Sequence, residues 1–298
     1  MNVALNSTSN KRNGESFSLV RILHLWHLLS LDAPSVAGLW TWFIAATLRV
    51  RIPRFVPFAM FLMVWILYVG DRLLDGRQSH LQPFGADRLE ERHHFHHRHR
   101  SAFIAGIAFT IIPLEMLLSH IPVNALHLYL ILGGLLTSYF GFIHTLTCSY
   151  RLPKELLVGP FFAAAVFIPT VAHRPDLRIA LLPSALLFAT LCDLNCLFIY
   201  RWEHEQEENL FQRHGHAATD FAQRHLGQIV GCTILGGVVL PLLCHQAHWM
   251  IPAACASSAA LLVRLHTIRR AFSPTTLRAA ADFILLIPLL FLPFLPRL

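Results

Sequence analysis

Long apolar stretches alternate with short polar segments along most of the chain. A helix needs about 20 consecutive apolar residues to cross the hydrocarbon core of a bilayer. Nine stretches fit this requirement: 33–50, 53–75, 102–120, 122–145, 154–171, 178–200, 226–245, 249–267 and 277–295. The pattern therefore predicts an all-α polytopic membrane protein with about nine transmembrane helices.

Three longer polar segments interrupt this pattern. Residues 1–20 are rich in Ser and Asn and lack the apolar centre of a signal peptide, so we expect a disordered cytosolic tail there. Residues 76–101 and 201–225 form long polar loops. Because no segment has the composition of a soluble domain, residues 21–298 are expected to form a single membrane domain.

Composition strengthens the membrane interpretation and argues against a nucleic-acid partner. Only 14% of the residues are charged, against about 25% in soluble domains. The formal net charge is +7, but the Lys and Arg residues lie in short segments between apolar stretches. If the N-terminus is inside, 18 of the 24 Lys and Arg residues fall on the inner side. The positive-inside rule then predicts a cytosolic N-terminus and an outer C-terminus. We expect an integral protein of a bacterial-type cytoplasmic membrane.

The end of the second stretch carries four charged side chains after an apolar run. Asp71, Arg72, Asp75 and Arg77 follow MVWILYVG. Asp71 and Asp75 are four residues apart, so on a helix they lie on one face. Ionisable groups at a membrane boundary are costly unless they face a cavity or a partner. Either the helix simply ends here, with paired charges in the headgroup zone, or these side chains face a binding site.

Further polar groups are expected on the same inner face. Asp193, Asn195 and Glu203 lie toward the end of the sixth stretch. Inner cationic side chains are Arg92 in the segment RHHFHHRHR, Arg151 and Lys154. Carboxylate and amide oxygens suit Mg²⁺, which is usually bound by protein oxygens and by phosphate oxygens of a substrate at the same time. Guanidinium groups neutralise the remaining phosphate charge. These groups together could hold a divalent metal ion and a diphosphate.

This arrangement resembles the UbiA superfamily of intramembrane prenyltransferases, whose members have nine helices and two Asp-rich motifs at the cytosolic ends of the second and sixth. Their first motif reads NDxxDxxxD. Asp71 falls on its Asn, Arg72 on its first Asp, Asp75 on its second and Ser79 on its third. The first motif therefore matches in part, with a cation where the family has a metal-ligating acid.

The second motif also matches in part. The form NxxxDxxxD places Asn195 on the Asn, Ile199 on the first Asp and Glu203 on the second. The family's basic segment after the fourth helix matches the chain loosely, with Arg151 and Lys154 among its cations. The resemblance covers helix count and motif placement from about residue 30 to the C-terminus.

The resemblance implies a UbiA-like fold around a central cavity and a definite activity. The chain would transfer an isoprenyl group from a prenyl diphosphate to a lipophilic acceptor in the membrane. It implies catalytic roles for Asp71, Asp75 and Glu203, and a Mg²⁺ site made by Asp71, Asp75, Asn195 and Glu203. It implies that the diphosphate is bound by Arg72, Arg77, Arg92, Arg151 and Lys154.

Two other functions are considered. A non-catalytic relative could bind or carry an isoprenoid or a quinone-like lipid. A small-solute transporter is disfavoured, because transporters place their site near the bilayer midplane, whereas the polar groups here gather at one face.

Three local questions accompany these functions. Arg72 could pair with Asp71 and Asp75, or it could reach the diphosphate. The His-rich loop 92–100 could bind a transition metal, but its interleaved arginines favour a cationic cover over an anion. Asp282, an isolated acid within a span, lies four residues after Arg278 and is expected to pair with it.

Overall fold

The computed structural model describes residues 22–79, 95–96, 98–145, 154–204, 217–243 and 249–295. Within these ranges all regular structure is helical and no strand occurs. The α-helices are α2 (Asp32–Thr47), α3 (Phe55–Ser79), α5 (Arg100–Leu118), α6 (Val123–Thr145), α7 (Lys154–His173), α8 (Arg178–His204), α9 (Ala217–Arg224), α10 (Leu226–Leu243), α11 (Met250–Ile268) and α12 (Pro274–Ile284). Short 3₁₀ helices are η2 (Pro175–Leu177), η3 (Arg269–Ala271) and η4 (Ile287–Phe294).

The all-α membrane prediction is confirmed by the length and composition of the helices. In the described part of the chain, seven helices are long and apolar enough to cross a membrane. A bent pair, formed by Ile22–Leu28 and α2, raises this number to eight. Each of the first eight predicted stretches coincides with an α-helix, and the last coincides with α12 and η4 together. The count of nine spans and the orientation of the termini stay predictions.

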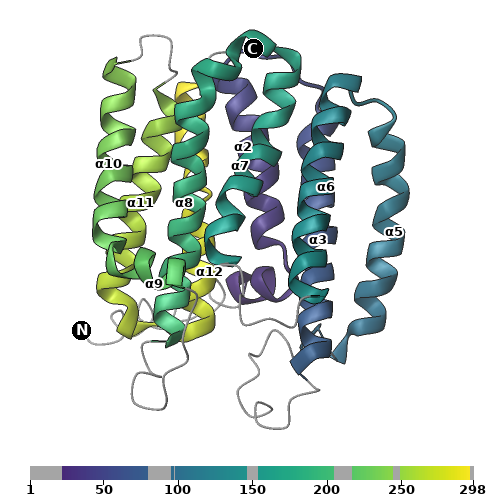
Figure 1. The fold of residues 1–298 in the computed structure, drawn as a ribbon, viewed down its shortest axis with the longest axis horizontal. Coiled ribbons are helices and arrows are strands. Elements are labelled where there is room, and N and C mark those ends of the chain that lie inside the picture. Colours follow the sequence, from purple (N-terminus) through teal and green to yellow (C-terminus); the bar gives the residue numbers. More distant parts are fainter. Residues whose placement is uncertain are drawn as a thin grey trace, which may run out of the picture.

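The helices run side by side in one bundle, with α10 and α11 at one edge, α5 at the other and α2 in the interior (Figure 1). Twelve of the sixteen residues of α2 are buried. Trp40 packs on Phe188 of α8 with ring centroids 4.2 Å apart, and its indole N–H donates to the Leu285 carbonyl over 2.8 Å. These contacts tie α2 to α8 and to the end of α12.

Helix α5 is about as apolar as α2, but almost all of it lies on the surface of the bundle. Of its 19 residues only Phe103 is buried. Large side chains such as Phe109 and Ile112 are exposed on it. In a bilayer, lipid tails cover such a face without cost, so exposure of this helix agrees with a membrane location.

A sharp bend precedes α2. The helix Ile22–Leu28 meets α2 at 92°. Ser30, at the bend, has φ 58°, in the left-handed region that residues with a Cβ rarely adopt. Such a conformation costs about 1–2 kcal/mol and persists only where the surroundings hold it. The bend brings His27 and Asp32, on either side of it, into hydrogen-bonding contact.

A close approach fixes α7 against α8. The Gly159 backbone N–H donates to Asp193 Oδ1 over 2.8 Å. A Cβ at position 159 would overlap the Ala189 carbonyl oxygen and the Asp193 carboxylate, so this crossing requires glycine. Asp193, one of the polar residues of the sixth stretch, therefore serves the contact between two helices.

Candidate functional site

A cavity of about 290 Å³ lies among α2, α3, α6, α7, α8 and the end of α12. Its wall is largely apolar and includes Val36, Leu67, Leu132, Phe161 and Phe162. Its polar lining residues are Tyr68, Asp71, Tyr129, Asn195 and Asp282. Tyr129 donates its hydroxyl to the Ala165 carbonyl over 3.2 Å. The cavity is therefore an apolar chamber with carboxylate and amide groups in its wall.

The helices of the two predicted motifs share this cavity. Asp71 comes from α3 and is half-buried, and Asn195 comes from α8 and is 5% exposed. These two residues were singled out from sequence as metal ligands, and the fold brings both to one chamber. Their side chains belong to stretches more than 100 residues apart.

Arg72 is held by a partner that the sequence analysis did not consider. Its guanidinium donates to the His27 carbonyl over 3.1 Å and to Ser30 Oγ over 2.6 Å. It also contacts Asp32 Oδ2 at 3.4 Å and lies 4.6 Å from the centroid of the Tyr68 ring. The side chain is 5% exposed. Arg72 thus joins α3 to the bend before α2, and its role in binding diphosphate stays a prediction.

Glu203 and Asp282 each have a partner on another helix. Arg278 of α12 forms an ion pair with Glu203 of α8. Asp282 Oδ1 accepts a hydrogen bond from Asn195 Nδ2 over 2.8 Å. The sequence analysis paired Arg278 with Asp282, but the packing of α12 on α8 gives both residues partners across the helix interface. Helical spacing alone could not show which neighbouring helix would face them.

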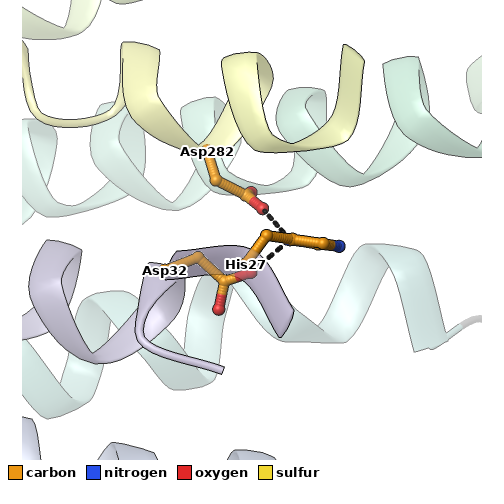
Figure 2. Close-up of side chains that lie close together, drawn as sticks. All are labelled: His27, Asp32 and Asp282. Carbon is orange, nitrogen blue, oxygen red and sulfur yellow. Dashed lines mark hydrogen bonds and ion pairs between the residues drawn. The ribbon is translucent and has the colours of Figure 1, made fainter. Parts of the chain in front are cut away.

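His27, Asp32 and Asp282 converge at one point (Figure 2). His27 Nδ1 lies 2.7 Å from Asp32 Oδ2 and 3.8 Å from Asp282 Oδ2. The three residues come from Ile22–Leu28, α2 and α12, and the side chains of His27 and Asp32 are almost completely buried. We call these three residues the His–Asp cluster. It adjoins the cavity through Asp282, which lines the cavity wall.

Part of the His-rich loop also contacts this region. His96 Nε2 lies 3.0 Å from Ser30 Oγ, the same hydroxyl that accepts from Arg72. The His96 ring stacks on Phe103 with centroids 4.2 Å apart, and His96 is 1% exposed. At least one histidine of the loop therefore has a buried structural contact.

Five predicted site residues cannot be placed by their side chains. Asp75 and Arg77 lie in α3 and Lys154 begins α7, but their side chains fall outside the described atoms. Arg92 and Arg151 lie outside the described residues altogether. Of the predicted Mg²⁺ ligands with described side chains, Asp71 and Asn195 line the cavity and Glu203 pairs with Arg278. The described side chains do not by themselves assemble the predicted Mg²⁺ site.

Sequence reasoning missed His27, Ser30 and Asp32 as site residues. Asp32 directly precedes the first predicted span, where an acid is a common signal for the start of a helix, so its position does not indicate a site. Asp282 did carry a signal, since an acid inside an apolar span needs a partner, but the partner chosen for it was local. His27 is one of 19 histidines and nothing in its neighbourhood distinguishes it.

Comparison with known proteins finds no family model that matches the chain. Neither the curated proteins nor the solved structures contain a match. Function is therefore inferred from the geometry of the chain itself.

Proposed function

We propose that this membrane protein binds an isoprenoid or quinone-like lipid in the cavity between α3, α6, α7 and α8. The observation that carries the proposal is a largely apolar chamber of about 290 Å³ with a few polar groups in its wall. Pockets of this kind bury an apolar body and orient it by a small number of hydrogen bonds. A chain of isoprene units supplies the apolar body, and a hydroxyl or quinone ring supplies the polar end.

Asn195 is the group best suited to orient such a ligand. Its side-chain oxygen is buried and accepts no hydrogen bond from the residues that the structure describes, while its amide N–H₂ donates to Asp282. A buried acceptor without a donor costs about 1–3 kcal/mol. A ligand hydroxyl that donates to Asn195 Oδ1 would recover much of that cost.

Prenyl transfer is the second candidate. It is favoured by one observation: Asp71 and Asn195, from the two Asp-rich segments, line the same cavity. A bound Mg²⁺ would stabilise the negative charge of the departing diphosphate. Asp71, Asn195 and Asp75 would hold the ion, and Arg77, Arg92, Arg151 and Lys154 would bind the diphosphate. Arg72 and Glu203 would have to leave Asp32 and Arg278 before they could take part.

Both candidate functions assume the membrane orientation that the distribution of Lys and Arg residues predicts. The polar ends of α3 and α8 then face the cytosol of a bacterial-type cell, and the C-terminus lies outside. A prenyl diphosphate would approach from the cytosol with its tail in the bilayer.

A substitution on α6 can test whether the ligand binds in the cavity. Gly133 of α6 lines the cavity, and an added Cβ there meets no atom within 4 Å. Gly134, its neighbour, also has open space at its Cβ and does not line the cavity. Because there is room for a Cβ at both positions, Gly133→Phe should place a ring against the chamber, and Gly134→Phe is the matched control.

The test measures binding of farnesol, a short-chain menaquinone and farnesyl diphosphate to purified protein in nanodiscs. We expect at least one to bind to the wild type and to Gly134→Phe, with affinity reduced at least tenfold in Gly133→Phe. Equal affinities in the two variants would remove the ligand from this cavity. Formation of the prenylated phenol together with diphosphate, in the presence of Mg²⁺, would establish transfer. Binding without formation of the prenylated product at any Mg²⁺ concentration would leave the lipid-binding function alone.

A further inference from the structure

The His–Asp cluster concentrates more negative than permanent positive charge. Asp32 and Asp282 are carboxylates in membrane-spanning segments, and Arg72 is the guanidinium that contacts Asp32. Charges in such surroundings need compensation, because the cost of removing them from water is several kcal/mol each. Asp282 has a neutral hydrogen-bond donor in Asn195. The cluster can therefore accommodate additional positive charge, either as a proton on His27 or on one of the carboxylates, or as a metal ion.

The orientation of the two carboxylates favours a cation between them. Asp32 Oδ1 accepts from the Ala33 backbone N–H over 3.0 Å, and Asp282 Oδ1 accepts from Asn195 over 2.8 Å. Each carboxylate therefore has Oδ1 held by a neighbour and presents Oδ2 to His27 Nδ1, and Asp32 Oδ2 also accepts from Arg72 over 3.4 Å. Metal-binding carboxylates are commonly oriented in this way, by hydrogen bonds to the oxygen that does not bind the metal.

The distances suit a small divalent ion. One ligand atom from each of the three residues lies within 4.8 Å of the other two. Metal–ligand bonds of about 2.0–2.2 Å place neighbouring ligand atoms roughly 3–3.5 Å apart in a tetrahedral site. The two measured separations from His27 Nδ1, 2.7 and 3.8 Å, bracket that range. Small side-chain movements would bring the three atoms around one ion.

Asn195 provides an independent indication of a ligand. The residue is 5% exposed, and its Oδ1 atom accepts no hydrogen bond within the described part of the chain. Its amide nitrogen lies 2.8 Å from Asp282, so this buried oxygen adjoins the cluster. Amide oxygens are accepted as ligands by hard divalent ions. A cation beside Asp282 would satisfy an oxygen that is otherwise buried without a partner.

We propose that His27, Asp32 and Asp282 form a binding site for one divalent transition-metal ion, with Asn195 Oδ1 beside it as a further oxygen donor. A mixed set of one imidazole and carboxylates suits Zn²⁺, Mn²⁺, Fe²⁺ or Co²⁺. The ion and a hydrogen on His27 Nδ1 compete for the same lone pair, so binding requires that this nitrogen be deprotonated. Arg72 also contacts Asp32 Oδ2 and opposes the ion, so the site is weaker than a closed structural zinc site. The site does not depend on the proposed lipid ligand.

Binding can be measured with Co²⁺ on chelator-treated, purified protein in detergent. We expect one Co²⁺ per chain and a visible absorption spectrum that appears on titration. Asp282→Asn keeps the shape of the side chain and should weaken binding at least tenfold, as should His27→Gln. The control changes His93, His94, His97 and His99 to Gln, and leaves His96 in place because it contacts Ser30. Gel filtration and thermal unfolding check that each variant is folded.

Two outcomes would overturn the proposed metal site. Co²⁺ binding that survives His27→Gln and disappears in the loop variant would assign the metal to the His-rich loop and overturn the proposal. A folded wild type that binds no Co²⁺ at millimolar concentration would show that the cluster takes only a proton, and would also overturn it. If the cluster variants do not fold, pulsed EPR of Cu²⁺-loaded wild type counts the imidazole ligands. One imidazole supports the cluster, whereas two or more exclude it.

Discussion

Two arginine–aspartate pairs in this protein have opposite surroundings. Arg72 and Asp32 lie 3.4 Å apart with side chains 5% and 0% exposed. Arg174 and Asp176, at the turn between α7 and α8, form two hydrogen bonds of 2.9 and 2.7 Å with side chains 51% and 58% exposed. The exposed pair has the shorter contacts and the better geometry. Burial, however, decides the cost of losing a partner, because a solvated charge can be satisfied by water and a buried one cannot.

The comparison teaches how the polar interior is held together. Arg72 is also bound by the His27 carbonyl and by Ser30, and Ser30 contacts His96. Removing one member leaves several groups with fewer partners. At the exposed turn, by contrast, both hydrogen bonds join residues of one short segment, Arg174 and Asp176. Four substitutions test whether burial determines the loss of stability, and they follow from the largest expected effect to the smallest.

Asp32→Ala should be the most damaging of the four. It leaves the Arg72 guanidinium buried with one counter-charge fewer, which costs about 3–5 kcal/mol. The apparent Tm in detergent should fall by roughly 10 °C. The double variant Asp32→Ala with Arg72→Ala should lose less than the sum of the single variants, because it leaves neither charge alone. Additive losses would show that the two residues do not interact.

Arg278→Ala should have an intermediate effect. Its partner Glu203 is 32% exposed, so water can reach part of the carboxylate once the guanidinium is removed. We expect a loss of about 1–3 kcal/mol in thermal or denaturant unfolding. Arg278→Lys should restore part of the stability by returning a charge. If Arg278→Ala lost as much stability as Asp32→Ala, the burial of the remaining charge would not determine the loss.

His96→Phe should have a smaller effect. The variant keeps a ring to stack on Phe103 but removes the hydrogen bond to Ser30 Oγ. A lost hydrogen bond of this kind costs about 1 kcal/mol. His99→Phe, at an exposed position of the same segment, is the control. If His96→Phe unfolds at the wild-type temperature, the contact between loop and bend contributes little.

Arg174→Ala should leave the apparent Tm unchanged within error, because both members of this pair are well solvated. The unfolding temperature should also respond to added salt as it does in the wild type. A decrease comparable to that of Arg278→Ala would show that short contacts matter more than burial, and the comparison would fail.

Much of the fold could be predicted from hydropathy, and the partners of the polar groups could not. Eight of the nine predicted stretches coincide with one α-helix each and the ninth with α12 and η4, because the apolar length needed to cross a bilayer is visible in the sequence. Asp71 and Asn195 were selected as site residues from spacing and residue type, and they do line one cavity. Local patterns of this kind do not require knowledge of which helices pack together.

The partner of Arg72 needed information that no local pattern contains. Asp32 reaches it only because the chain turns by 92° at Ser30, in a conformation that a serine rarely adopts. Similarly, Arg278 meets Glu203 because α12 packs on α8. The resemblance to UbiA proteins concerns acids within the two motifs, whereas the buried polar contacts include residues outside them. Whether the chain carries out prenyl transfer stays a prediction.

The His–Asp cluster joins residues from both ends of the chain, and this has a consequence for biosynthesis. Asp282 follows Arg72 by 210 residues. At translation rates of 5–20 residues per second, it leaves the ribosome about 10–40 s after Arg72. During that interval Arg72 can already be neutralised by Asp32, which precedes it, whereas Asn195 must wait for α12. The early pair would allow the first spans to settle in the bilayer before the last helix arrives to complete the cluster.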